Sequence, residues 1–334
     1  MARAYLSTCG LKAERPRCCC RLSLSNFPRK LRALSCMLKS GITQSQWEVH
    51  SMKFGLMAAN LMGNVEGAAV AEIARAAEEV GFHSIWVAEH AVVPVEYAST
   101  YPYDEGGRLF KGSSQLDIAD PLIWLAFAAA VTTKIRLATG ILILPQRNPV
   151  VAAKEIASLD RLSNGRLDLG IGSGWLREEF DALGVPFEAR GARTDEYLRA
   201  LRVLWSDTEA EFHGEFVDFA PVYCQPKPSQ SAIPILVGGH SDRAARRAGE
   251  LGDVFFPAER PVETLEALYS AVKQYADDAG RDPSAIELWT TSTGDREHLE
   301  QLIEVGVTQV MVPARSPEQL QGRYAQLIVD YSTR

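Results

Sequence analysis

The sequence lacks the features that mark membrane, disulfide-stabilised and nucleic-acid-binding proteins. Five of its six cysteines lie within the first 36 residues and only Cys224 comes later, so no disulfide framework supports the main part of the chain. The longest apolar stretches, such as residues 121–132, are too short to span a bilayer. Residues 52–334 are acidic overall and offer no basic stripe for a phosphate backbone. We therefore expect a cytoplasmic protein without a membrane or nucleic-acid partner.

Patterns that bind metal are also scarce. The five histidines after residue 51 form no HxH or HExxH pair, and the cysteine run at 18–20 has no second spaced pair of Cys or His. We predict no metal site, which disfavours a metal-dependent hydrolase. What is present, 46% hydrophobic and 23% charged residues, is typical of a globular enzyme.

The first 51 residues differ in composition from the rest of the chain. They hold nine Lys or Arg against two acidic residues, contain most of the cysteines and show no periodic core pattern. Two interpretations remain open: a transit segment, or upstream sequence before a natural start at Met52. We favour the second, because Met52 directly precedes the first convincing strand. Residues 1–51 are expected to be disordered or not native, and residues 52–334 to form the functional domain.

From Met52 onward, short β-rich apolar runs alternate with segments of helical periodicity, a pattern typical of βαβ units. Eight such runs in about 280 residues favour a (β/α)₈ TIM barrel. An open doubly wound sheet remains an alternative, although no GxGxxG motif follows the first run. The expected strands are residues 53–58, 84–89, 135–144, 166–172, 234–239, 253–257, 286–291 and 307–313.

Two connections are longer than ordinary loops. Residues 90–120 follow the second predicted strand and residues 211–232 come after the fourth, the latter with an apparent hairpin turning at Gly214. Long loops at the carboxyl ends of barrel strands commonly form lids or walls of active sites. We expect both insertions to do so. The aromatic residues of the first, which favour an organic and partly apolar substrate, are Tyr97, Tyr101, Tyr103 and Phe110.

Two glycine-containing strand ends predict a ligand. In LDLGIGSGW, residues 167–175, Gly172, Ser173 and Gly174 precede a helix, so a flat ring or an anion can lie against the backbone. Barrel packing alone is the competing explanation for these glycines. In PILVGGHSD the helix amides that follow the strand favour phosphate; the residues concerned are Gly238, Gly239, His240 and Ser241.

Glu89 and His90 stand where the second strand ends. A histidine over the barrel mouth titrates near neutrality and can give or take a proton, although a single histidine is more often structural. Gly140, in the middle of the overlong strand 135–144, indicates a bulge where something approaches the backbone closely.

These residues resemble the bacterial luciferase-like monooxygenase superfamily, and especially its actinobacterial branch of oxidoreductases that depend on the deazaflavin coenzyme F420. The similarity covers essentially all of 52–334, and its most specific marks are WVAEH (86–90), the long stretch 137–205 and PILVGGHSDRAARRAGELGD (234–253).

The resemblance implies a TIM-like barrel that binds a flavin or deazaflavin at its carboxyl-end mouth. It implies a non-prolyl cis peptide under the ring at Gly140-Ile141 with Thr139 beside it, ring contacts from Gly172, Ser173 and Gly174, and phosphate binding through residues 238–241. It further implies that His90 acts near the reactive ring atom, with Glu89 as its neighbour. A homodimer is compatible with the family.

Three functions follow as hypotheses. The first is hydride transfer between F420 and a small organic substrate, assisted by His90. The second keeps the barrel but uses reduced FMN and oxygen, as a monooxygenase. The third is a barrel that binds flavin or deazaflavin without turnover, as a carrier or sensor.

Overall fold

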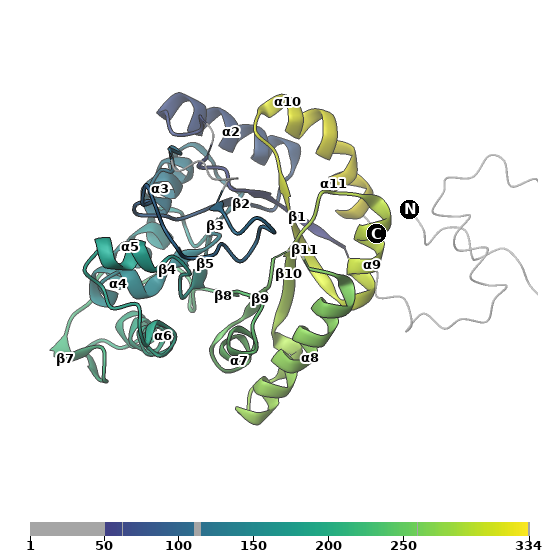
Figure 1. Cartoon of the computed structure of the whole chain (residues 1–334). Helices are drawn as coiled ribbons and strands as arrows, with labels where there is room; N and C mark the ends of the chain where they lie inside the picture. Colours follow the sequence, from purple (N-terminus) through teal and green to yellow (C-terminus); the bar gives the residue numbers. More distant parts are fainter. Residues whose placement is uncertain (1–50, 62, 110–114, 259, 333–334) are drawn as a thin grey trace, which may run out of the picture. The chain divides into compact units, whose positions relative to one another are not determined.

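The computed structural model describes residues 51–61, 63–109, 115–258 and 260–332. The predicted extension therefore lies, apart from Ser51, outside the described residues, as does Phe110. In the part that is described, parallel strands form one closed sheet, seen near the centre of Figure 1. Its strands are β1 (Lys53–Met57), β2 (Ser84–Val87), β3 (Arg136–Thr139), β4 (Leu142–Ile143), β5 (Leu167–Gly172), β8 (Ile235–Gly238), β9 (Val254–Phe256), β10 (Glu287–Thr291) and β11 (Val307–Pro313).

The sheet closes into a barrel because β11 pairs with β1 and β3 pairs with β5. The third strand of the predicted set is interrupted: β3 stops at Thr139, the Gly140-Ile141 peptide bond is cis, and β4 resumes beside β5. Counting β3 and β4 as one broken strand leaves eight barrel positions. The predicted (β/α)₈ fold and the predicted irregularity at Gly140 are both confirmed.

Helices surround the barrel and begin where the sequence offers caps. Asp120 accepts hydrogen bonds from the first-turn amides of α3, and Asn148 does the same for α4, each followed by proline at the first helical position. The α-helices are α2 (Gly67–Val80), α3 (Pro121–Val131), α4 (Pro149–Leu162), α5 (Arg177–Ala182), α6 (Arg190–Ser206), α7 (Asp242–Leu251), α8 (Val262–Asp278), α9 (Arg296–Val305), α10 (Pro317–Gln319) and α11 (Ala325–Ser332). Shorter turns are η4 (Leu144–Gln146), η5 (Pro283–Ala285) and the π-helical η6 (Leu320–Tyr324).

Apolar side chains fill both sides of the sheet. The larger cluster packs strands against helices, while a smaller one centred on Trp86 belongs to strand residues and includes Phe256 and Trp289 at centroid distances of 5.1 and 5.8 Å. A barrel filled in this way is a packed core and not a pore, so a ligand must bind at its mouth. Among the described residues, no helix combines the length and apolarity that crossing a bilayer requires.

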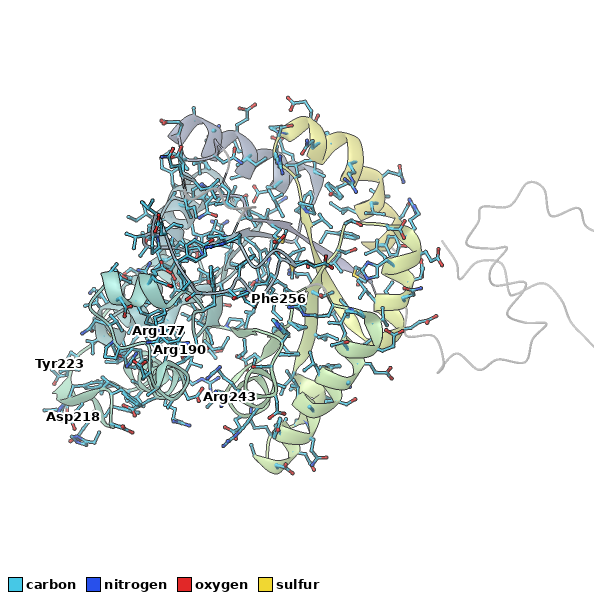
Figure 2. All side chains as sticks on the ribbon, viewed as in Figure 1. Arg177, Arg190, Asp218, Tyr223, Arg243 and Phe256 are labelled. Atoms are coloured by element: carbon cyan, nitrogen blue, oxygen red, sulfur yellow. The ribbon has the colours of Figure 1, made fainter. Side chains whose placement is uncertain are left out.

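The second predicted insertion does not lie where we expected. Its hairpin, β6 (Ala210–His213) and β7 (Asp218–Val222), follows helix α6 and leads into the amino end of β8. Figure 2 shows Asp218 and Tyr223 at the outer edge of the molecule, away from Phe256 in the barrel. The prediction that residues 211–232 form a wall of the active site is wrong, because a segment entered from a helix arrives at the opposite end of the barrel from the strands' carboxyl ends.

Candidate active site

A cavity of about 380 Å³ opens at the carboxyl ends of the strands. It is lined by the ends of β2, β5 and β8, by the bulge between β3 and β4, and by the loop that follows β2. The structure brings nearly all the predicted site residues together here; those lining the cavity are Glu89, His90, Gly140, Ile141, Gly172, Ser173, Gly174, Gly238, Gly239, His240 and Ser241.

Thr139 is the exception among the predicted cofactor residues. Its side chain is fully buried, its hydroxyl donates a hydrogen bond of 2.7 Å to the carbonyl of Gly170, and it is not part of the cavity wall. Thr139 therefore ties the interrupted strand to β5 from behind the bulge.

His90 is held by a buried carboxylate that the sequence analysis missed. Its Nδ1 lies 2.9 Å from Glu179 Oε2, while the other Glu179 oxygen accepts the backbone N–H of Ala91 at 2.7 Å. The Glu179 side chain is inaccessible to solvent and that of His90 is 8% exposed. This pairing fixes the orientation of the imidazole and leaves Nε2 as the nitrogen that can exchange a proton with a ligand.

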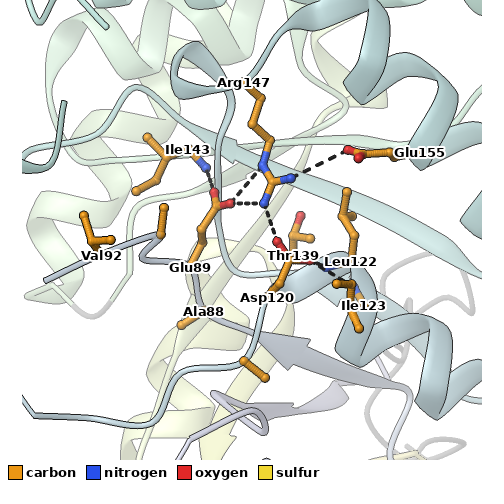
Figure 3. Close-up of polar contacts among 12 residues, drawn as sticks. Ala88, Glu89, Val92, Asp120, Leu122, Ile123, Thr139, Ile143, Arg147 and Glu155 are labelled. Carbon is orange, nitrogen blue, oxygen red and sulfur yellow. Dashed lines mark hydrogen bonds and ion pairs between the residues drawn. The ribbon is translucent and has the colours of Figure 1, made fainter. Parts of the chain in front are cut away.

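Glu89 turns away from His90 to a different partner. It accepts two hydrogen bonds from Arg147, of 2.9 and 2.5 Å, and a third from the backbone N–H of Ile143 (Figure 3). Arg147 also pairs with Asp120 at 2.8 Å. Burial raises the pKa of the Glu89 carboxyl, and Arg147 offsets part of that effect. Glu89 thereby anchors the strand that resumes after the bulge, directly beside the cavity floor.

The glycines that surround the floor are explained by the bulge. A Cβ on Gly172 would lie 2.5 Å from Ile141 Cδ1, one on Gly238 would lie 2.9 Å from Ile141 Cγ2, and one on Gly170 would collide with the carbonyl oxygen of Thr139. Packing against Thr139 and Ile141 therefore requires these small residues, as the competing sequence interpretation held. Gly140 and Ile141 form the floor of the cavity, and β5 and β8 contribute only the glycines Gly172 and Gly238 to its lining.

The other end of the cavity is basic. Ser241 caps α7 by accepting the N–H of Ala244, and Gly239 has a φ of +119°, which favours glycine. Arg190, Arg243 and Arg247 line this end although the sequence analysis did not single them out. The acidic Asp242 accepts a 2.7 Å hydrogen bond from Tyr275 and is not part of the cavity wall.

His240, at the basic end of the cavity, does not act as a proton donor. His240 accepts a 2.7 Å hydrogen bond from Arg260, and burial together with the Arg260 charge lowers the pKa of His240, so its ring is neutral at neutral pH. Positive potential at this end of the cavity comes instead from the arginines and from the amino end of α7.

An aromatic cover spans the cavity. Trp175 contacts His90, Tyr97 and Tyr101 with edge-on rings, at centroid distances of 5.9, 5.9 and 5.1 Å. Tyr103 lies 5.3 Å from His240 and extends the cover to the basic end of the cavity. Burial raises the pKa of the Tyr101 hydroxyl to about 12, so it remains a neutral donor. The described parts of the first insertion, residues 90–109 and 115–120, thus cover the cavity as a lid, and the lid packs against Trp175 in the loop that follows β5.

The structure places the predicted residues other than Thr139 around one cavity, and it adds Glu179, Arg147, Arg190, Arg243 and Arg247 as residues that line the cavity or hold its wall. Glu179 was visible in the sequence only as one of two glutamates opening a helix, which the helix dipole already explains. Glu179 and its partner His90 are 89 positions apart in the sequence, so no local sequence pattern indicates that they meet.

Comparisons with known proteins agree with this geometry. The model of the luciferase-like monooxygenase family matches residues 52–328. An uncharacterized protein of Mycobacterium tuberculosis is 35% identical over 278 residues, which cover 80% of this chain and 94% of that protein. The FMNH2-dependent dimethylsulfone monooxygenase of Pseudomonas putida is 30% identical over 209 residues, covering 61% of this chain and 52% of that enzyme. An F420-dependent secondary alcohol dehydrogenase superimposes with a TM-score of 0.69 at 20% identity, covering 85% of this chain and 99% of that one.

Proposed function

Because the chain belongs to the luciferase-like monooxygenase family, we propose that it is an oxidoreductase which transfers a hydride between coenzyme F420 and a small organic substrate. The observation that carries the proposal is the His90–Glu179 pair at the wall of a cavity whose floor is formed by Gly140 and Ile141 and whose far end is basic. This set positions a ring, holds a phosphate and provides one proton-transfer group. The F420-dependent alcohol dehydrogenase of the same fold supports the choice of cofactor and of a carbonyl or hydroxyl substrate.

The protein's own groups fit this chemistry step by step. The floor formed by Gly140 and Ile141 and the basic end around Arg243 suit the ring and phosphate of the cofactor. F420, when bound, accepts or supplies the hydride. In the oxidative direction, a C–H hydride leaves the substrate carbon while the hydroxyl proton passes to His90 Nε2, so that a carbonyl remains. Glu179 stabilises the imidazolium that results, and the lid excludes water.

The test is the His90→Ala variant of the full chain. We expect its turnover with F420 to fall by about 10²- to 10⁴-fold, the usual contribution of a general acid–base group, while F420 still binds. His213→Ala is the matched control, because His213 is an exposed hairpin residue outside the cavity. Unchanged turnover in His90→Ala would remove His90 from the reaction, and absence of turnover in the parent over a broad substrate panel would favour a binding protein.

A second candidate function is that of an FMN-dependent monooxygenase, favoured by the similarity to FMNH2-dependent dimethylsulfone monooxygenases. The chain matches about half the length of those enzymes, and a flat floor with a phosphate end suits either ring. Oxygen consumption that requires both reduced FMN and substrate would support this candidate against the first.

A further inference from the structure

A second hollow, of about 400 Å³, adjoins the basic end of the cavity between helices α6 and α7. The two hollows share four lining residues: Arg190, Gly191, Arg243 and Arg247. Two further arginines, Arg199 and Arg246, line only the second hollow, so that it is bordered by five arginines in all. Figure 2 shows Arg190 and Arg243, which border both hollows. We call this second hollow the arginine groove.

Positive charge in the arginine groove is only partly neutralised. Its two acidic residues each pair with one arginine, Asp195 with Arg247 and Glu250 with Arg246. Five cations against two anions leave a surplus of three positive charges. Burial and the neighbouring Arg177 and Arg243 lower the pKa of Arg190, as expected where cations face one another. This local surplus of positive charge contrasts with the net negative charge of residues 52–334, so the overall composition does not explain it.

Core packing does not explain the surplus. Arg199, Arg243 and Arg246 are exposed, and arginines crowded at one site repel each other unless an anion is bound. The groove begins where the phosphate of a bound cofactor would lie and continues away from the barrel along α6 and α7. An anion held there would therefore be joined to the far side of that phosphate. Arginine forks are well suited to carboxylates, which they bind with two parallel hydrogen bonds.

We propose that the arginine groove binds a chain of carboxylates attached to the cofactor's phosphate, namely the oligoglutamate tail of F420. This inference rests on the proposed function. FMN ends at its phosphate and has no group to place in the groove, whereas F420 continues from its phosphate, through a lactyl group, into γ-linked glutamates. The groove thus selects between two cofactors whose rings the floor would accept equally.

The test measures the binding of F420 with a long glutamate tail, of F420 without glutamates, and of FMN to the full chain, by quenching of cofactor fluorescence at low and high salt. The diagnostic variant is R199A/R246A, because these two residues lie outside the main cavity. The matched control is R75A/R161A, which removes two exposed arginines from α2 and α4, outside both hollows.

We expect the parent and the control to bind long-tailed F420 about five- to tenfold more tightly than the tail-less form at low salt, and to lose most of that preference at high salt, as weak exposed ion pairs do. R199A/R246A should bind both forms alike, with the affinity for tail-less F420 unchanged. Equal binding of both forms by the parent, or a preference retained by the variant, would overturn the groove inference while leaving the proposed function intact. Failure of the parent to bind F420 of either length would instead overturn the proposed function, and the inference with it.

Discussion

At the scale of single residues, the side chain of Ile141 shapes the cavity floor. It rises from the bulge between β3 and β4 into space that a Cβ on Gly172 or Gly238 would occupy. The glycines that suggested a ligand site in the sequence are therefore needed first for packing. The glycines affect the cavity indirectly, because they leave room for Ile141, which forms the floor together with Gly140.

This interpretation predicts a rescue. Gly172→Ala should destabilise the protein by about 1–3 kcal/mol, the cost of overpacking, because its Cβ meets Ile141 Cδ1. Ile141→Val removes that atom and should cost ~0.5–1.5 kcal/mol by itself. The double variant should be more stable than the sum of the two losses predicts, as measured by urea unfolding. Strict additivity would show that the two residues do not compete for space.

Sequence reasoning at this scale succeeded where a residue's role is local. Gly140 and His90 stand out by their position within or after a strand, and both lie in the cavity wall. Arg147 precedes Asn148 and Pro149, a pattern that by itself indicates only the capped start of a helix, and the structure has that cap at Asn148. Its pairing with Glu89, 58 residues away, depends on the closed barrel, so the sequence alone did not predict it.

At the scale of elements, helix α5 holds the lid at two adjacent positions. Glu179 accepts the N–H groups of Ala91 and Val92 near the start of the lid, and Glu178 accepts those of Ala98 and Ser99 further along it. Both glutamates belong to the first turn of α5, beside the glycine loop. Helix α5, which follows β5 in the sequence, therefore holds the lid over the cavity.

The Glu178 contact has a defined pH dependence. Burial raises the pKa of the Glu178 carboxyl, but hydrogen bonds from the Ser99 hydroxyl and from backbone N–H groups outweigh this effect and lower the pKa to about 2. A depressed carboxyl pKa stabilises the ordered lid above the ordinary value near 4.5, and this contribution is lost as the pH falls toward 2. The lid is therefore fully fastened at neutral pH.

We expect Glu178→Ala to release residues 97–101 without unfolding the barrel. Hydrogen exchange at the amides of Ala98 and Ser99 should accelerate roughly five- to tenfold, the effect of losing charge-assisted hydrogen bonds at an exposed site. Glu188→Ala serves as control, since the exposed Glu188 pairs with Arg177 and has no hydrogen bond to the lid. Unaltered exchange in Glu178→Ala would show that the Glu178 hydrogen bonds do not hold this part of the lid.

At the scale of the whole barrel, the alternation of eight β-rich runs with helical segments correctly predicted the closed parallel sheet. The hairpin of β6 and β7 was also predicted, but its location was wrong because a length of loop does not reveal which end of the barrel it joins. The arginine groove was missed for a related reason. Arg199 and Arg246 lie on different helices, 47 positions apart, and in the sequence each resembles an ordinary solvated helix face.

The proposed hydride transfer depends on which cofactor the cavity binds. The most direct measurement is a titration of the full chain with F420 and, separately, with FMN, followed by fluorescence quenching of the cofactor or of the nearby Trp175. At low salt we expect saturable binding of long-tailed F420 and about five- to tenfold weaker binding of FMN, which has no tail for the arginine groove. Tight binding of FMN with weak binding of F420 would contradict the proposal and favour the oxygen-dependent function, and binding of neither would show that the floor and the basic end serve packing alone.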